Sequence, residues 1–171
     1  MKAVLVSIQP KWCTKIASRE KLVEIRKTMP KLETPFNVYI YETLGKYIGR
    51  TTKHEGIGKV IGEFVCDEIF PIRVFDNGTI QDWNRYDMKD SCVPYDEIVE
   101  YIGKNRTGYG WRISNLKIYD SPKDIWKFHN DSVCWLKGCD IPYLYESPCA
   151  NCGKSRLTRP PQSWCYVTSV E

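Results

Sequence analysis

The first 26 residues constrain the fold more than any other part of the chain. An alternating apolar run ends at Ile8, and Pro10 opens an amphipathic stretch that extends to Ser18. Proline suits the first turn of a helix, where its missing N–H leaves no helical hydrogen bond unmade. Residues 21–26, Lys-Leu-Val-Glu-Ile-Arg, then have the pattern of a strand that follows a turn. The segment therefore predicts a strand, a short helix and a second strand that carries a carboxylate close to two cations.

Composition places the chain among globular proteins of ordinary size. Its 171 residues are enough to bury a core, and 42% hydrophobic with 27% charged residues exclude a disordered chain. Aromatic residues are abundant, with six Trp and eleven Tyr, so we expect stacking surfaces or a large aromatic core. The net charge of +4 permits a polyanionic partner without requiring one.

The sequence predicts a cytoplasmic protein with no membrane partner. No apolar run approaches the roughly 20 residues of a membrane-spanning helix. The apolar start from Met1 to Val6 is too short for the core of a signal peptide and lacks a cleavage site. Most of the eight cysteines should then be reduced thiols, although an even number also permits disulfides.

Strand patterns outnumber helix patterns along the chain. Strands are expected at residues 2–8, 21–26, 37–42, 58–69 and 109–119, and helices at 10–18 and 94–102, with a helical turn at 121–128. Because the strands mostly lie far apart in sequence, they predict an α+β fold. We expect a mixed, mostly antiparallel, barrel-like sheet with peripheral helices. The expected core residues are Leu5, Ile8, Val23, Ile25, Val60, Phe64, Ile113 and Ile118.

We expect one domain over residues 1–171, with a cysteine-rich insertion at residues 130–160. Periodicity fades in this insertion, and cysteine, glycine and proline accumulate there. No internal repeat or low-complexity tract suggests a further domain.

The N-terminal segment resembles the start of ASCH domains, which belong to the PUA-like superfamily. Their pattern is Ser-Ile-x-Pro, a helix, then Gly-x-Lys-x-x-Glu-x-Arg. Here Ser7-Ile8-Gln9-Pro10 matches, Lys21, Glu24 and Arg26 fall in register, and Arg19 replaces the glycine. Weaker similarity continues through residues 38–43, 58–64, 108–113 and 160–167, the last two as in phage- and prophage-type ASCH proteins. The resemblance implies the PUA-like β-barrel and a cleft lined by residues 21–26, but one fold hosts many functions.

Lys21, Glu24 and Arg26 form the expected binding site for a polar ligand. A carboxylate accepts from a base edge or a ribose hydroxyl, arginine offers a planar fork, and lysine a point charge for phosphate. Glu24 and Arg26 share one face of a strand, so an ordinary surface ion pair is the simpler alternative. A regular strand would place Lys21 on the opposite face, so a shared site requires Lys21 to lie in the turn.

A small enzyme is the alternative function, with Lys21, Glu24 and Tyr41 as its candidate catalytic residues. A lysine beside a carboxylate in a cleft can act in acid–base chemistry when its pKa is lowered. Within the superfamily, an amidohydrolase acts on N4-acetylcytidine, but its motif has threonine where this chain has Glu24, which argues against that activity. Some ASCH proteins cleave RNA. The two histidines, His54 and His129, lie in no recognisable motif.

Two further segments combine basic and aromatic residues, at 104–112 and 154–164. Glycines allow a backbone to approach phosphate closely, aromatic rings stack on bases and cations neutralise phosphates. A solvated loop and a core tryptophan are the alternative explanations. The candidate nucleic-acid contacts in these segments are Arg106, Tyr109, Trp111, Arg112, Arg159 and Trp164.

The cysteines of the insertion have the spacing of a metal site. Cys149 and Cys152 form a Cys-x-x-Cys-Gly knuckle, and Cys134 and Cys139 complete a set of four thiolates for one tetrahedral structural zinc. Cys165 is the expected substitute ligand, and free thiols are the alternative.

The sequence thus predicts an RNA-binding, PUA-like domain with a zinc-stapled insertion and an RNA or nucleotide-like partner. The alternative is a small enzyme of ribonuclease or amidohydrolase type that acts on RNA or a modified nucleoside. A protein-interaction module is a third reading, because the aromatic surplus could form an adhesive patch.

Overall fold

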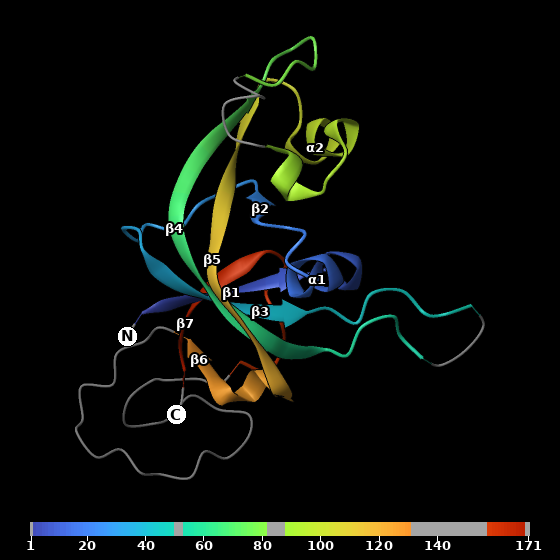
Figure 1. Cartoon of the computed structure of the whole chain (residues 1–171), viewed down its shortest axis with the longest axis vertical. Helices are drawn as coiled ribbons and strands as arrows, with labels where there is room; N and C mark the ends of the chain where they lie inside the picture. Colours follow the sequence, from blue (N-terminus) through green and yellow to red (C-terminus); the bar gives the residue numbers. More distant parts are fainter. Residues whose placement is uncertain (1, 50–52, 82–87, 131–156, 170–171) are drawn as a thin grey trace. The chain divides into compact units, whose positions relative to one another are not determined.

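The computed structural model describes residues 2–49, 53–81, 88–130 and 157–169 (Figure 1). These residues form seven strands, two α-helices and two short 3-10 helices. In chain order they are β1 (Ala3–Ile8), α1 (Pro10–Ala17), β2 (Val23–Arg26), β3 (Phe36–Glu42), β4 (Lys59–Val74), η1 (Met88–Ser91), α2 (Tyr95–Ile102), β5 (Arg106–Lys123), η2 (Ile125–Lys127), β6 (Phe128–Asn130) and β7 (Trp164–Ser169).

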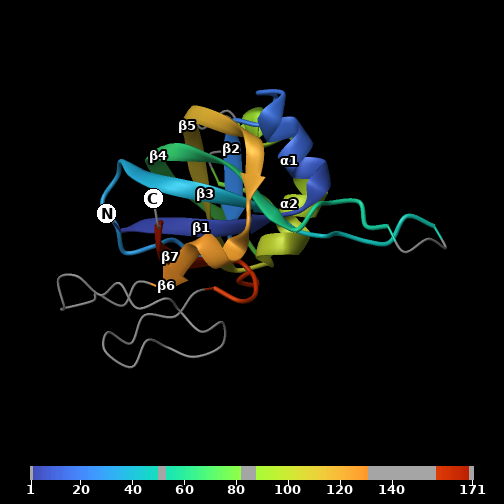
Figure 2. The same ribbon diagram turned by 90° about the horizontal axis from the view of Figure 1, so that it is seen from below.

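The strands form one mixed sheet in the order β2-β5-β4-β3-β1-β7-β6. Strand β1 pairs in parallel with β3, whereas the pairs β1–β7, β2–β5 and β6–β7 are antiparallel. Figure 2 shows β3, β1 and β7 in this succession. The predicted α+β class with a mostly antiparallel sheet is confirmed. Strands β2 and β6 stand at the ends of the order, so in the described residues the sheet is open and not a closed barrel.

The chain divides into two compact units, each assembled from segments far apart in sequence. The first unit comprises Met1–Pro10, Asn37–Glu63 and Ile118–Glu171, and the second comprises Lys11–Phe36 and Phe64–Lys117. The long strands β4 and β5 contribute to both units. The expectation of one domain with an insertion at residues 130–160 stays a prediction.

The core of the first unit is built around β1, which is buried at every position. Its sequence Ala-Val-Leu-Val-Ser-Ile is apolar at every position except Ser7, which suits a strand covered on both faces. Phe128 packs edge-on against Tyr39, with ring centroids 4.9 Å apart. The cluster comprises Ala3, Leu5, Tyr39, Tyr41, Val60, Phe128, Leu157 and Val167.

The core of the second unit joins β2 and β4 to helix α2. Helix α2 begins after Pro94 and ends before Gly103, as the sequence predicts, and it buries Ile98 and Ile102. Gly103 has a φ of 91°, a conformation that glycine adopts without a steric cost. The cluster comprises Val23, Ile25, Phe70, Ile72, Val74, Ile80, Met88, Ile98 and Ile102.

Two expectations about β5 and its surroundings are wrong. Ile118 is 39% exposed, because the later part of β5 lies beyond the residues that pair with β2 and is largely exposed. The helical turn expected at residues 121–128 is mostly extended, since β5 runs to Lys123 and only Ile125–Lys127 is helical. The other expected core residues are buried.

Candidate functional site

A helix cap sets the position of the candidate site in the second unit. After α1, the Glu20 N–H donates to the Lys15 carbonyl at 2.9 Å and the Arg19 N–H donates to the Ile16 carbonyl at 2.9 Å. These two bonds form a Schellman motif, in which the residue after the cap adopts the left-handed conformation. Arg19 is that residue, with a φ of 62°. Although Arg19 replaces the glycine of the ASCH pattern, it keeps the backbone conformation that glycine favours.

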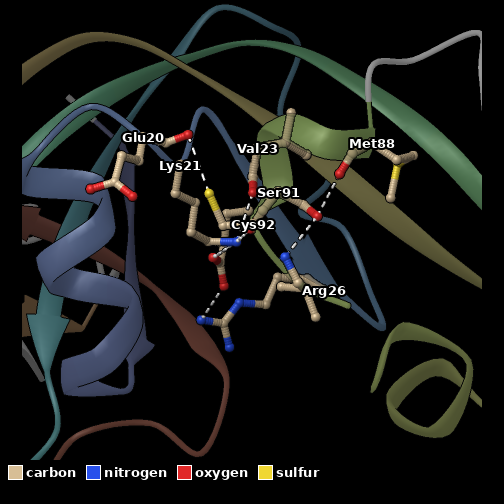
Figure 3. Close-up of polar contacts among 9 residues, drawn as sticks. Glu20, Lys21, Val23, Arg26, Met88, Ser91 and Cys92 are labelled. Carbon is tan, nitrogen blue, oxygen red and sulfur yellow. Dashed lines mark hydrogen bonds and ion pairs between the residues drawn. The ribbon is translucent and has the colours of Figure 1, made fainter. Parts of the chain in front are cut away.

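Because of this turn, Lys21 lies before β2 and not within it, as a site shared with Glu24 and Arg26 requires. Its ammonium donates to the carbonyl of Val23 at 2.8 Å and to that of Ser91 at 2.7 Å (Figure 3). It also lies 3.3 Å from a Glu24 carboxylate oxygen. An ammonium has three N–H donors, and Lys21 has three such acceptors. The residue is 1% exposed, and its charge also lies 5.3 Å from the ring centroid of Trp12.

Glu24 accepts from two cations at once. Its second carboxylate oxygen lies 2.9 Å from Nη2 of Arg26, and Glu24 and Arg26 are 6% and 7% exposed. Ions buried to this degree are stable only when each is paired and hydrogen-bonded. These three side chains therefore form one connected group with a formal charge of +1. We call Lys21, Glu24 and Arg26 the ion cluster.

The ion cluster and the apolar core lie on opposite faces of β2. Val23 and Ile25 join the apolar cluster of the second unit, so Glu24 and Arg26 occupy the other face. In the antiparallel pairing with β5, Glu24 lies opposite Trp111 and Arg26 lies opposite Tyr109. Directly opposite residues share a face, so an indole and a phenol flank the two charged side chains.

The segment that contains η1 holds the cluster from the other side. The Leu22 N–H donates to the Asp90 carbonyl at 2.7 Å, and the Cys92 thiol donates to the Glu20 carbonyl at 3.3 Å. The Ser91 hydroxyl donates to the Met88 carbonyl at 2.7 Å, which closes the turn whose carbonyl receives Lys21 (Figure 3). The sequence analysis missed Ser91 and Trp12, since neither belongs to a motif that points to Lys21.

Comparison with solved structures identifies the fold. An ASCH protein from Zymomonas mobilis matches with a TM-score of 0.53 and 20% identity, over 72% of this chain and 73% of that chain. The chain has the ASCH fold. A tyrosine-to-phenylalanine variant of that protein matches with a TM-score of 0.54 and 19% identity, over 73% of this chain and 77% of that chain. A serine-to-alanine variant matches with a TM-score of 0.53 and 20% identity, over 71% of this chain and 73% of that chain.

The resemblance of the sequence to ASCH domains is thus confirmed at the level of the fold. A scan against protein-family models and a search of curated proteins both find no match. Identity near 20% carries no activity or ligand from one ASCH-fold protein to another. The phage- and prophage-type relationship stays a prediction.

Tyr41, the third candidate catalytic residue, lies on β3 in the first unit of the ASCH fold. Its side chain is buried in the apolar cluster there, and this burial raises the pKa of its phenol. Burial also raises the pKa of the neighbouring Glu42. The ion cluster belongs to the second unit, so a pocket shared with Tyr41 stays a prediction.

The segment 104–112 forms the start of β5 and departs from the expected stacking surface. Trp111 is fully buried and packs edge-on against Phe36, at 6.1 Å between ring centroids, so no base reaches its ring in this structure. The glycines of the segment also serve packing: a Cβ at Gly110 would lie 2.3 Å from the Phe70 ring, and one at Gly108 would lie 2.6 Å from Ile102.

The remaining candidates of both segments are at least partly accessible. Arg106 is exposed, Tyr109 is half-buried, and the exposed Arg112 pairs with Glu68 at 2.9 Å. In the first unit, Arg159 is exposed and Trp164 is half-buried, with its ring edge-on to Tyr166 at 5.4 Å between centroids. Their contacts with nucleic acid stay predictions.

The predicted zinc ligands Cys134, Cys139, Cys149 and Cys152 lie outside the described residues. Within the described residues, no three His, Cys, Asp or Glu side chains are placed to hold a metal. Cys165, the expected substitute, is a half-buried free thiol on β7, and burial raises its pKa to about 11. Structural zinc in the insertion stays a prediction. No helix in the described part of the chain is long and apolar enough to cross a membrane.

Proposed function

We propose that this ASCH-fold protein binds RNA through the ion cluster of Lys21, Glu24 and Arg26. The observation that supports this function is that two buried cations share one carboxylate, which leaves a formal charge of +1. Charge acts over a greater range in a site shielded from water than at an exposed position, so the cluster attracts an anion. An RNA phosphate is such an anion, and the planar guanidinium of Arg26 matches its oxygens.

Each member of the cluster has a different role in this proposal. Arg26 meets the phosphate, and Glu24 fixes the orientation of the guanidinium through their 2.9 Å contact. Lys21 is a positioning residue, because its ammonium donates to the carbonyls of Val23 and Ser91 and forms an ion pair with Glu24. Because these contacts already occupy the ammonium, they favour a positioning role for Lys21 over acid–base catalysis.

A half-buried aromatic residue beside Arg26 supports a nucleic-acid ligand over a simple anion. Tyr109 lies directly opposite Arg26 in the β2–β5 pairing, so the phenol and the guanidinium share one face. A nucleotide presents a base and a phosphate a few ångströms apart, which suits an aromatic ring next to a cation. Arg106 and Arg112 are exposed on the same strand and are further proposed phosphate contacts, although Arg112 lies opposite Val23 and so on the other face from Arg26.

The proposal is tested by fluorescence anisotropy with a labelled single-stranded RNA of mixed sequence, titrated at several salt concentrations. We expect affinity to fall as salt rises, because phosphate contacts release counterions. Arg26→Lys should weaken binding about tenfold, since lysine keeps the charge but loses the fork. Because the charge is kept, the salt dependence of Arg26→Lys should match that of the wild-type protein.

Arg73→Lys is the matched control, because Arg73 is an exposed arginine of the same unit. Circular dichroism and thermal melting confirm that each variant is folded before affinities are compared. Equal affinities of the wild-type protein and Arg26→Lys, or the absence of salt-dependent RNA binding, would overturn the proposal. Shortened RNA or a changed nucleoside after incubation would instead support the enzyme alternative.

A further inference from the structure

The segment between β3 and β4 forms an arm that extends away from the strands of its own unit (Figures 1 and 2). Its described residues are 43–49 and 53–58. The Ile48 N–H donates to the Lys53 carbonyl at 2.9 Å, and the Glu55 N–H donates to the Lys46 carbonyl at 3.0 Å. These bonds make the arm a short antiparallel ladder with a defined register.

A pair of rings, the exposed Tyr47 and the half-buried His54, lies at the centre of this ladder. Tyr47 and His54 are bridge partners, and the hydrogen bonds on either side of them leave them as a non-hydrogen-bonded pair. Side chains approach most closely at such pairs. The two rings lie 4.1 Å apart between centroids with an interplanar angle of 31°, and Tyr47 remains 61% exposed. With His54 against one side of it, Tyr47 still presents most of its surface to solvent.

Two exposed lysines adjoin the ring pair in sequence. Lys46 precedes Tyr47 and Lys53 precedes His54, whereas Glu55 is the only carboxylate in the described residues of the arm. Because successive side chains of a strand alternate between faces, Lys46 and Lys53 project on the face of the ladder opposite Tyr47 and His54. Single-stranded nucleic acid is bound by aromatic rings on which bases stack, together with cations that meet phosphates, and the arm offers the rings on one face and the cations on the other. Exposed Leu44, Ile48 and Ile57 add apolar surface that would also suit a protein, but they offer nothing to a phosphate.

We propose that the arm is a second contact for single-stranded RNA, in which a base stacks on Tyr47 and the flanking phosphates meet Lys46 and Lys53. The inference rests on the proposed function for the class of ligand, but it concerns residues that the ion cluster does not include.

Tyr47→Ala should weaken binding of the labelled single-stranded RNA at least about fivefold, the loss expected for one stacked base. Tyr47→Phe keeps the ring and should bind as the wild-type protein does. Lys53→Gln should lower the slope of log affinity against log salt by about one, since one phosphate contact is lost. Trp126→Ala is the matched control, because Trp126 is an exposed aromatic residue of the same unit with Lys127 5.8 Å from its ring centroid.

Cross-linking with RNA that contains 4-thiouridine separates the arm from the ion cluster. We expect cross-links at Tyr47 or His54 that persist in Arg26→Lys. Cross-links at the arm together with unchanged affinity in Arg26→Lys would retain the arm and overturn the proposed role of the ion cluster. Unchanged affinity in Tyr47→Ala, or no cross-link at the arm, would overturn the inference about the arm alone. A concentration-dependent dimer that dissociates in Tyr47→Ala would show that the arm binds a second copy of the chain instead.

Discussion

At the scale of single residues, the burial of Lys21 decides how the candidate site is built. A lysine that is 1% exposed must have its ammonium satisfied inside the protein, and here two carbonyls and a carboxylate do so. The same contacts tie the turn before β2 to η1, so Lys21 links two segments that are distant in sequence. Lys21 therefore contributes to stability as well as to the charge of the site.

Lys21→Met should lower the free energy of unfolding by about 3–5 kcal/mol, the cost of removing one partner of a buried ion pair. Methionine keeps the length and apolar volume of the side chain, so the lowered free energy of unfolding measures the contribution of the ammonium. Lys15→Met is the matched control: Lys15 pairs with Glu20 at 2.9 Å, but these side chains are 41% and 58% exposed. Its cost should be much smaller, because solvent screens an exposed ion pair.

Urea denaturation of the two variants checks this difference. Equal losses in Lys21→Met and Lys15→Met would contradict a structural role for the buried ammonium. If Lys21→Met retains its stability but loses RNA binding, Lys21 contacts the ligand directly.

At the scale of elements, the end of α1 sets the direction in which the chain enters β2. Arg19 holds a left-handed conformation that costs a residue with a Cβ roughly 1–2 kcal/mol. The two hydrogen bonds of the Schellman motif compensate for that cost. The chain therefore forms the turn after α1 although Arg19 stands where glycine is preferred.

Arg19→Gly should raise the free energy of unfolding by about 0.5–1 kcal/mol, because the steric cost disappears while glycine adds entropy to the unfolded chain. Arg19→Ala keeps a Cβ and should give no gain, which makes it the control for loss of the arginine side chain. Thermal melting of both variants measures the effect. A gain in Arg19→Ala equal to that in Arg19→Gly would assign the cost to the arginine charge and not to the backbone.

At the scale of the whole molecule, several buried or half-buried acids make the folded state hold protons more tightly than the unfolded chain. Burial is the largest cause that raises the pKa of the Cys66 thiol to about 12, from an ordinary value of 9.0. Burial likewise raises the pKa of Tyr41, Tyr119 and Cys165. Such groups contribute stability that is full below their unfolded pKa and is lost as pH rises through the folded pKa.

Stability should therefore fall between pH 8 and pH 10.5, with about 2 kcal/mol of the loss due to Cys66. The unfolded chain ionises this thiol above pH 9, whereas the folded protein keeps it neutral until about pH 12. In Cys66→Ala that part of the loss should disappear. Urea denaturation of both proteins at pH 7 and pH 10.5 separates this slope from the constant cost of the substitution. Parallel pH profiles would contradict the assignment to Cys66.

The sequence by itself determined the features that depend on neighbours along the chain. The order of strand, helix and strand over residues 3–26 and the end of α2 at Gly103 follow from backbone geometry and side-chain period, which act over a few residues. The resemblance of residues 7–26 to the ASCH pattern singled out Lys21, Glu24 and Arg26, which the structure joins in one cluster.

Only the tertiary structure decided what depends on contacts between distant segments. The Ser91 carbonyl that receives Lys21 lies 70 residues away, and no local pattern encodes that contact. Trp111 and Ile118 are both apolar, but only the structure shows that Trp111 is buried in the core whereas Ile118 is exposed. The open order of the sheet and the ring pair of Tyr47 and His54 also arise from pairing. Pairing and burial are set by the lowest free energy of the whole packed chain, so a residue's own neighbours in sequence cannot fix them.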